Sequence, residues 1–374
     1  MINSLIFSTV RGIGSFLTSE TSNLPSIEAS EVDKRVLSVA WNQDWSGFIV
    51  GTILGFNVYS SEPIKESISR DEHNTGFKIA EMLFLSNLFA LVGNGYNCSE
   101  YPPNKVFIWD DHRNCCVREI TLKSEVIAVK LRREYIVVVL KRSIYVYSFK
   151  DLKVHALIDT VMNPKGLCCV SQAEAKAVLA CPGLHQGQVQ VHDLRRNTIK
   201  CIKAHDSDIA CMTLTLDGSL LATCSTKGTL VRIFNAHDGT LLQEFRRGME
   251  RVEIYSIAIS SNLKWVAVSS EKGTLHVFHL RPDILSSPKT IAQVSSFSYI
   301  RGYLPKYSYD NERSFAQFSL PVSTKSIVGF GPENTVVLVG IDGRFDIGQG
   351  GKMVELEHKR FLSLPQTEDT MVVT

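Results

Sequence analysis

Leu220-Leu-Ala-Thr-Cys-Ser-Thr-Lys-Gly-Thr-Leu230 aligns without a gap on Trp265-Val-Ala-Val-Ser-Ser-Glu-Lys-Gly-Thr-Leu275, at an offset of 45 residues. The same offset pairs Ile209 with Ile254, so the similarity extends toward the N-terminus of both copies. Each copy holds short β-branched and aromatic runs separated by Gly, Asn, Asp and Ser, which is typical of antiparallel strands. A repeat of about 40–45 residues with several strands per copy indicates a β-propeller blade.

Five weaker copies follow the same order of apolar strand, polar turn, apolar strand, glycine turn and alternating strand. They cover residues 36–59, 79–109, 126–149, 166–192 and 326–345. Seven copies of about 45 residues account for most of the 374 residues. The sequence therefore predicts one all-β domain, a seven-bladed WD-repeat-like propeller.

We place this propeller at residues 31–364, with a long loop at 281–313 in the sixth blade. Residues 1–30 form an N-terminal segment that is either disordered or part of the ring closure, and residues 365–374 form a C-terminal tail. Trp109-Asp110 is the WD dipeptide that the chain retains.

Composition excludes several classes of protein. A net charge of +2 gives no global field that would favour nucleic acid, so no nucleic-acid partner is expected. The nine cysteines form no CxxC motif and are an odd number, which fits a reducing, cytoplasmic compartment better than a disulfide framework. No apolar stretch approaches the roughly 20 residues of a membrane span, and we expect no signal peptide.

Catalytic and cofactor motifs are not found. Gly348-Gln-Gly-Gly-Lys352 lacks the upstream glycine of a phosphate loop, and Gly93-Asn-Gly95 lacks the third glycine of a dinucleotide fingerprint. The ten histidines show no metal-ligand spacing. We expect a protein that is not an enzyme and needs neither cofactor nor metal.

Phe245-Arg246-Arg247-Gly248 lies between the two strongest repeats. Successive side chains of an extended segment point to opposite faces, so Arg246 should lean toward the 205–234 unit and Arg247 toward the 251–278 unit. Arginine forks bind phosphate through two hydrogen bonds, lysine adds a point charge, and hydroxyls donate to the remaining oxygens. The split pair therefore predicts two adjacent anion pockets.

Both units supply groups of this kind. On the first side lie His205, Ser225, Thr226, Lys227, Thr229 and Arg232. On the second side lie Arg251, Ser269, Ser270, Lys272, Thr274 and His276. For either copy alone, a plain turn between strands explains Lys-Gly-Thr better than an anion site does. The histidines can be structural, and Ser and Thr also occur as ordinary strand residues. The coincidence of all these groups with the arginine pair favours the anion pockets.

Phe245-Arg-Arg-Gly248, with Ala204-His-Asp-Ser207 before it and Tyr255-Ser-Ile-Ala258 after it, resembles the PROPPINs, the phosphoinositide-binding seven-bladed propellers of autophagy that include the WIPI proteins. The resemblance runs from Val36 to about Leu364, and several segments are most similar to plant members. They include Phe77-Lys-Ile-Ala-Glu-Met-Leu83, Ala180-Cys-Pro-Gly-Leu-His-Gln-Gly187 and Ser314-Phe-Ala-Gln-Phe318.

This resemblance implies two head-group sites, for phosphatidylinositol 3-phosphate and phosphatidylinositol 3,5-bisphosphate. By position, the first pocket takes His205, Thr229, Arg232 and Arg246. The second pocket takes Arg247, Ser270, Lys272 and Thr274. The family further implies autophagy lipid-transfer or conjugation proteins as partners, and a peripheral location on pre-autophagosomal, endosomal or vacuolar membranes.

The long loop contains Phe297-Ser-Tyr-Ile-Arg-Gly-Tyr-Leu-Pro-Lys-Tyr-Ser-Tyr309, with five aromatic side chains beside Arg301 and Lys306. Aromatic and aliphatic groups beside cations suit a segment that dips into a lipid headgroup layer. A loop folded back over its own blade would bury the same rings, and the residues alone do not separate the two. The family resemblance favours membrane insertion, through Phe297, Tyr299, Ile300, Tyr303 and Leu304.

A generic WD-repeat scaffold that binds proteins and never contacts lipid is the main alternative function.

Overall fold

The computed structural model describes residues 6–10, 36–70, 76–95, 100–282, 284, 313–320, 324–332, 335–349 and 354–360. These residues form seven separate antiparallel sheets, each built from strands that are consecutive in the chain. We call the sheets blades 1 to 7 in chain order. Blades 1 to 6 have four strands, and blade 7 has four consecutive strands joined by the N-terminal strand.

The strands of blades 1 to 4 are β2 (Val36–Trp41), β3 (Gly47–Thr52), β4 (Phe56–Ser61), β5 (Ile64–Arg70), β6 (Phe77–Met82), β7 (Leu88–Gly93), β8 (Lys105–Asp110), β9 (Cys115–Thr121), β10 (Ala128–Leu131), β11 (Tyr135–Val139), β12 (Ser143–Ser148), β13 (Val154–Asp159), β14 (Cys169–Val170), β15 (Val178–Pro182), β16 (Gln188–Asp193) and β17 (Thr198–Lys203). Blades 5 to 7 contain β18 (Ile209–Leu214), β19 (Leu220–Ser225), β20 (Leu230–Asn235), β21 (Leu241–Arg246), β22 (Ile254–Ile259), β23 (Trp265–Ser270), β24 (Thr274–His279), β25 (Ala316–Ser319), β26 (Ser326–Phe330), β27 (Thr335–Gly340), β28 (Arg344–Gln349), β29 (Val354–Arg360) and β1 (Ile6–Val10).

The burial of each strand follows its place in the blade. The second strands β19 and β23 are buried at every residue, as their near-continuous apolar sequence predicts. The fourth strand β17 is exposed at all but one residue. Apolar side chains of neighbouring blades pack together, and the largest cluster joins blades 5 and 6 through Phe245, Ile257 and Phe278. The blades are therefore held by burial between sheets, with polar outer edges.

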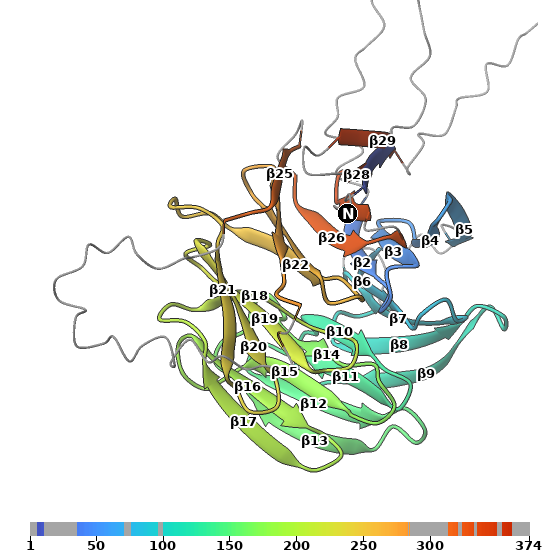
Figure 1. Cartoon of the computed structure of the whole chain (residues 1–374). Helices are drawn as coiled ribbons and strands as arrows, with labels where there is room; N and C mark the ends of the chain where they lie inside the picture. The colour runs from blue at the N-terminus through green and yellow to red at the C-terminus, as the bar shows by residue number, and fades with distance from the viewer. Residues whose placement is uncertain are drawn as a thin grey trace, which may run out of the picture.

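The blades close into a ring. The first strand of each blade lies beside the first strand of the next, and β26 of blade 7 lies beside β2 of blade 1 (Figure 1). The strand β1 pairs with β28 and β29 in blade 7. A closed ring of blades leaves only short sheet edges, which limits pairing with other chains.

The prediction of a seven-bladed all-β propeller is confirmed. Each weaker sequence repeat coincides with a separate blade, and Trp109-Asp110 ends β8. The division into a segment at 1–30, a propeller at 31–364 and a tail at 365–374 stays a prediction, and the tail lies outside the described residues. Within the described part of the chain, no helix is long and apolar enough to cross a membrane.

Candidate anion-binding site

The arginine pair stands where β21 ends and the chain passes from blade 5 to blade 6. Phe245 is fully buried, and its ring stacks on Phe278 of blade 6 with 4.8 Å between centroids. Arg246 is the last residue of the strand, opposite Leu230 in register, and its side chain is exposed. The buried phenylalanine thus fixes the chain on blade 6 and brings the arginines to the junction of the two blades.

Arg247 is half-buried against the turn between β19 and β20. Its backbone N–H donates to Thr229 O at 2.9 Å, and its Nε donates to Gly228 O at 2.8 Å. Desolvation lowers the pKa of Arg247. The guanidinium also lies close enough to His276 of blade 6 for its charge to lower the pKa of that histidine. Arg247 therefore contacts the turn of the 205–234 unit and also lies near His276 of the 251–278 unit. Strand alternation had predicted that it would lean toward the 251–278 unit alone.

Of the first group of predicted residues, Arg232 on β20 and His205 lie near each other. Arg232 Nε donates to Glu244 Oε2 at 2.6 Å, and its Nη1 donates to the carbonyl oxygen of Ala204 at 2.6 Å. His205 is buried, and its Nε2 lies 3.0 Å from Thr223 Oγ1. Burial, aided by the charge of Arg232, lowers the pKa of His205 to about 4. The histidine is therefore neutral at neutral pH, and Glu244 compensates the charge of Arg232.

The second group gathers where β23 turns into β24. Ser270 and Thr274 face each other in register, and their hydroxyl oxygens are 2.9 Å apart. Lys272, in the turn, forms an ion pair with Glu250. Burial, together with the charge of Arg247, lowers the pKa of His276 to about 4, and its buried Nδ1 has no hydrogen-bond partner among the described residues.

Both Lys-Gly-Thr sequences do form turns between strands. Gly228 has φ of 65° and Gly273 has φ of 64°, in the left-handed region that favours glycine. A Cβ at Gly228 would lie 1.9 Å from Val252 O, so the backbone of blade 6 approaches this turn closely. The turns place Lys227 and Lys272 at the exposed end of their blades. Both Lys-Gly-Thr sequences are therefore turns, and their part in an anion site stays a prediction.

Two neighbours of this turn have roles in holding it. The buried Ser225 hydroxyl accepts the N–H of Lys227 at 3.4 Å, and the carbonyl oxygen of Thr226 accepts Arg251 Nε at 3.3 Å. Arg251 is exposed, and it ties the start of blade 6 to blade 5.

Ser269 does not join the second group. Its side chain is fully buried, and its hydroxyl donates to Ser326 O of blade 7 at 2.9 Å. Because adjacent strand residues point to opposite faces, Ser269 and Ser270 cannot both face the same pocket. The inclusion of Ser269 among the predicted site residues conflicts with this geometry.

Glu244 and Glu250 are site residues that the sequence argument missed. Glu244 is opposite Arg232 in the β20–β21 register, and it precedes Arg246 by two residues on the same strand. The alternation that separates the arginines would have placed Glu244 on the side of Arg246. Glu250 follows the strand in an irregular connection, where no periodicity predicts its direction.

The predicted membrane-contacting residues Phe297, Tyr299, Ile300, Tyr303 and Leu304 lie outside the described residues. Their assignment stays a prediction.

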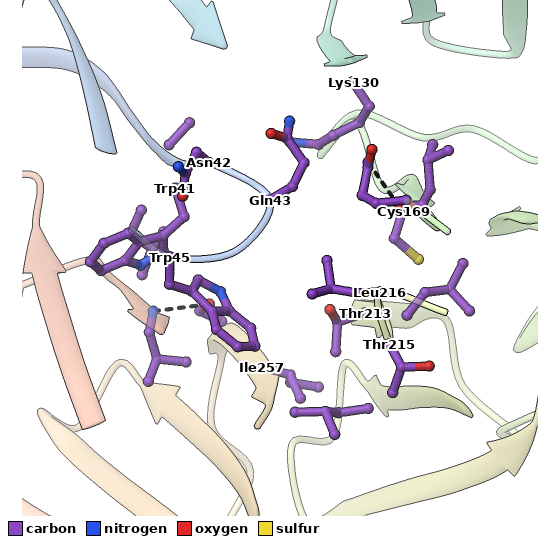
Figure 2. A pocket seen from close by; sticks show the side chains of 18 of the residues that line it. Trp41, Asn42, Gln43, Trp45, Lys130, Cys169, Thr213, Thr215, Leu216 and Ile257 are labelled. Carbon is purple, nitrogen blue, oxygen red and sulfur yellow. Dashed lines mark hydrogen bonds between the residues drawn. The ribbon is translucent and has the colours of Figure 1, made fainter. Parts of the chain in front are cut away.

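A cavity of about 510 Å³ lies elsewhere, on the axis of the ring, and residues from all seven blades line it. Figure 2 shows the side chains of Gln43, Trp45 and Lys130 pointing into it. Lys130 forms an ion pair with the buried Glu81, so its charge is compensated. None of the predicted head-group residues lines this cavity.

Among the described residues, no three His, Cys, Asp or Glu side chains are placed to hold a metal ion.

Comparisons with known proteins agree with this architecture. A PROPPIN family model matches residues 36–323. Autophagy-related protein 18e of Arabidopsis thaliana is 72% identical over 377 residues, covering 99% of both chains. SVP1-like protein 2 of Schizosaccharomyces pombe is 34% identical, covering 69% of this chain and 70% of its own.

Solved structures match as well. Kluyveromyces lactis Hsv2 with its complete loop 6CD superimposes with a TM-score of 0.68 at 25% identity, covering 84% of this chain and 92% of that one. KlAtg21, solved in complex with the coiled coil of AgAtg16, has a TM-score of 0.67 at 23% identity, with coverage of 86% and 96%. By the family model and the 72% identical relative, the chain belongs to the PROPPINs, a family of non-enzymatic autophagy proteins.

Proposed function

We propose that this protein binds phosphatidylinositol 3-phosphate and phosphatidylinositol 3,5-bisphosphate through two rim pockets, one on each side of the Phe245–Gly248 motif. The observation that carries the proposal is the convergence of cations at the junction of blades 5 and 6. Arg246 is exposed at the end of β21, Arg247 lies beside His276, and Lys227 and Lys272 project from the two neighbouring turns. Hydroxyls of Ser270 and Thr274 lie in the same second group.

The pockets are expected to work together. One phosphate exchanges water for protein donors with a small net gain, so each pocket alone should bind weakly. Two pockets on one rigid rim, with a loop that contacts the same bilayer, make the later contacts effectively intramolecular. Apparent affinity then rises by a factor on the order of 10² to 10⁴.

The bound protein would recruit autophagy machinery to forming autophagosomes, and it would also occupy endosomal or vacuolar membranes. The complex of KlAtg21 with the coiled coil of AgAtg16 supports a protein partner of this kind. It equally supports the alternative of a WD-repeat scaffold that binds proteins without lipid.

Flotation with liposomes that carry each of the seven phosphoinositides in turn separates the two functions. Binding restricted to phosphatidylinositol 3-phosphate and phosphatidylinositol 3,5-bisphosphate supports the proposal. A protein that floats with none of them at physiological salt is a scaffold only.

A further inference from the structure

One residue, Glu250, contacts both cations of the second pocket, Arg247 and Lys272. Its carbonyl oxygen accepts Arg247 Nη2 at 2.6 Å, and its carboxylate forms the ion pair with Lys272. Lys272 is thus paired with an anion that the protein itself supplies. A phosphate oxygen would have the same geometry and the same sign of charge at this position.

We propose that Glu250 is a built-in counter-anion of the second pocket, which a phosphate must displace from Lys272 and which thereby sets the affinity of that pocket. The inference rests on the proposed function, because it assumes that the second group receives a phosphate.

The pair is placed so that the carboxylate can leave. The side chains of Glu250 and Lys272 are 73% and 49% exposed, so rotation of the glutamate into water breaks no packing. The flanking arginines are anchored by side-chain hydrogen bonds, from Arg247 Nε to Gly228 O and from Arg251 Nε to Thr226 O. Displacement therefore needs only a side-chain rotation of Glu250, while the arginine stays in position for the incoming phosphate.

The carboxylate of Glu250 is ionised at neutral pH. The hydrogen bond and charge of Lys272 lower the pKa of Glu250, so it competes as an anion at neutral pH. An exposed ion pair of this type contributes only a small free energy. Its removal should therefore change affinity by a small factor that a titration resolves.

The chain offers a matched control. Glu253 lies three residues further along the same connection and forms an ion pair with Lys165, with 2.5 Å between Nζ and Oε1. Glu253→Gln removes the same charge and the same kind of pair. Lys165 and Glu253 belong to neither group, but they line a pocket with Thr226 and Arg251. This variant therefore reports the effect of removing a carboxylate near the blade junction while the Glu250–Lys272 pair stays intact.

The test is calorimetric titration of the full chain with D-myo-inositol 1,3-bisphosphate, and separately with inorganic phosphate. We expect Glu250→Gln to tighten binding about two- to fivefold, the range of one exposed ion pair. Glu253→Gln should change it by less than about 1.5-fold. In a Lys272→Ala background, Glu250→Gln should give no gain.

Each other outcome has a definite meaning. If the wild-type chain binds the bisphosphate and Glu250→Gln binds it equally well, the inference is wrong and the proposed function stands. Equal tightening in both glutamine variants, or a gain that persists without Lys272, also overturns the inference. If no variant binds either probe, both the inference and the second pocket are wrong.

Discussion

Arg247 donates a hydrogen bond of 2.8 Å from Nε to the carbonyl oxygen of Gly228, which holds the second arginine of the pair against the turn of blade 5 while Arg246 remains exposed. The two arginines thus differ in setting although they are adjacent. One is oriented by backbone acceptors, and the other projects from the end of the strand.

Replacing Arg246 and Arg247 together by Thr should abolish flotation with liposomes that carry phosphatidylinositol 3-phosphate. Both pockets lose their bidentate donor, and avidity between them is lost. Arg195 and Arg196 supply a control pair on blade 4, with exposed side chains and their own acidic partners. Their double Thr variant should float like the wild type. Retained flotation of the Arg246/Arg247 variant at physiological salt would refute the pocket assignment.

Replacing Phe297, Ile300 and Leu304 by Ser should weaken liposome binding and leave binding of the soluble head group unchanged. Apolar side chains gain free energy in the bilayer interface, which a soluble head group does not provide. The measurement compares flotation with calorimetric titration of the head group. An equal loss in both assays would instead indicate that these side chains pack against the protein.

Acidification should destabilise the protein through His205 and His276. Burial lowers the pKa of each to about 4, whereas an unfolded histidine titrates near 6.5. The unfolded chain therefore binds more protons between these values, and stability is lost as the pH falls from about 6.5 to about 4. The expected loss at pH 5 is about 1–2 kcal/mol for each residue.

Urea unfolding at pH 7 and pH 5 measures this loss. His205→Asn and His276→Asn should each reduce the difference in unfolding free energy between the two pH values, whatever they do to stability at pH 7. A pH dependence identical to that of the wild type would show that these histidines do not cause it. His192, whose pKa is also lowered by burial, should leave a residual slope in both variants.

Arg132→Ala should lower the free energy of unfolding by about 2–4 kcal/mol. The Arg132 side chain is 1% exposed, and it joins blade 3 to blade 4 by donating to Ser171 O at 2.5 Å and to Ala173 O at 2.8 Å. Its removal leaves a cavity and two carbonyl groups without this donor. The adjacent Arg133 is 65% exposed, and Arg133→Ala should cost less than about 0.5 kcal/mol. Thermal unfolding gives the melting temperature of each variant, which should be lower for Arg132→Ala than for Arg133→Ala. Similar melting temperatures would disprove the role of Arg132.

The number of blades and the junction of blades 5 and 6 could be predicted because they depend on local pattern. The 45-residue offset aligns β19 with β23, and every residue of both strands is buried. The arginine pair was recognisable because it falls where one repeat passes to the next. These are properties of the chain order alone, and they need no knowledge of side-chain contacts.

Contacts across strands were harder to predict. Ser269 was predicted on the same side as Ser270, but strand alternation directs Ser269 to Ser326 of blade 7. Arg232 was predicted to line the first pocket, and the pairing with Glu244, which lies opposite it in register, was not foreseen. Charge balance at a site depends on such pairings, which a list of residue types at a given spacing does not contain.

Ring closure brings together strands that a ribosome makes far apart in time. β2 lies beside β26, and β1 pairs with β28, so both of these early strands wait for blade 7. Earlier blades can form as they appear, since each is made of consecutive strands. These closing contacts join residues about 290 or more positions apart, so they form only after blade 7 has been made. Until then the nascent ring exposes the apolar faces of blades 1 and 6, and it is at this stage that a chaperone would protect it from aggregation.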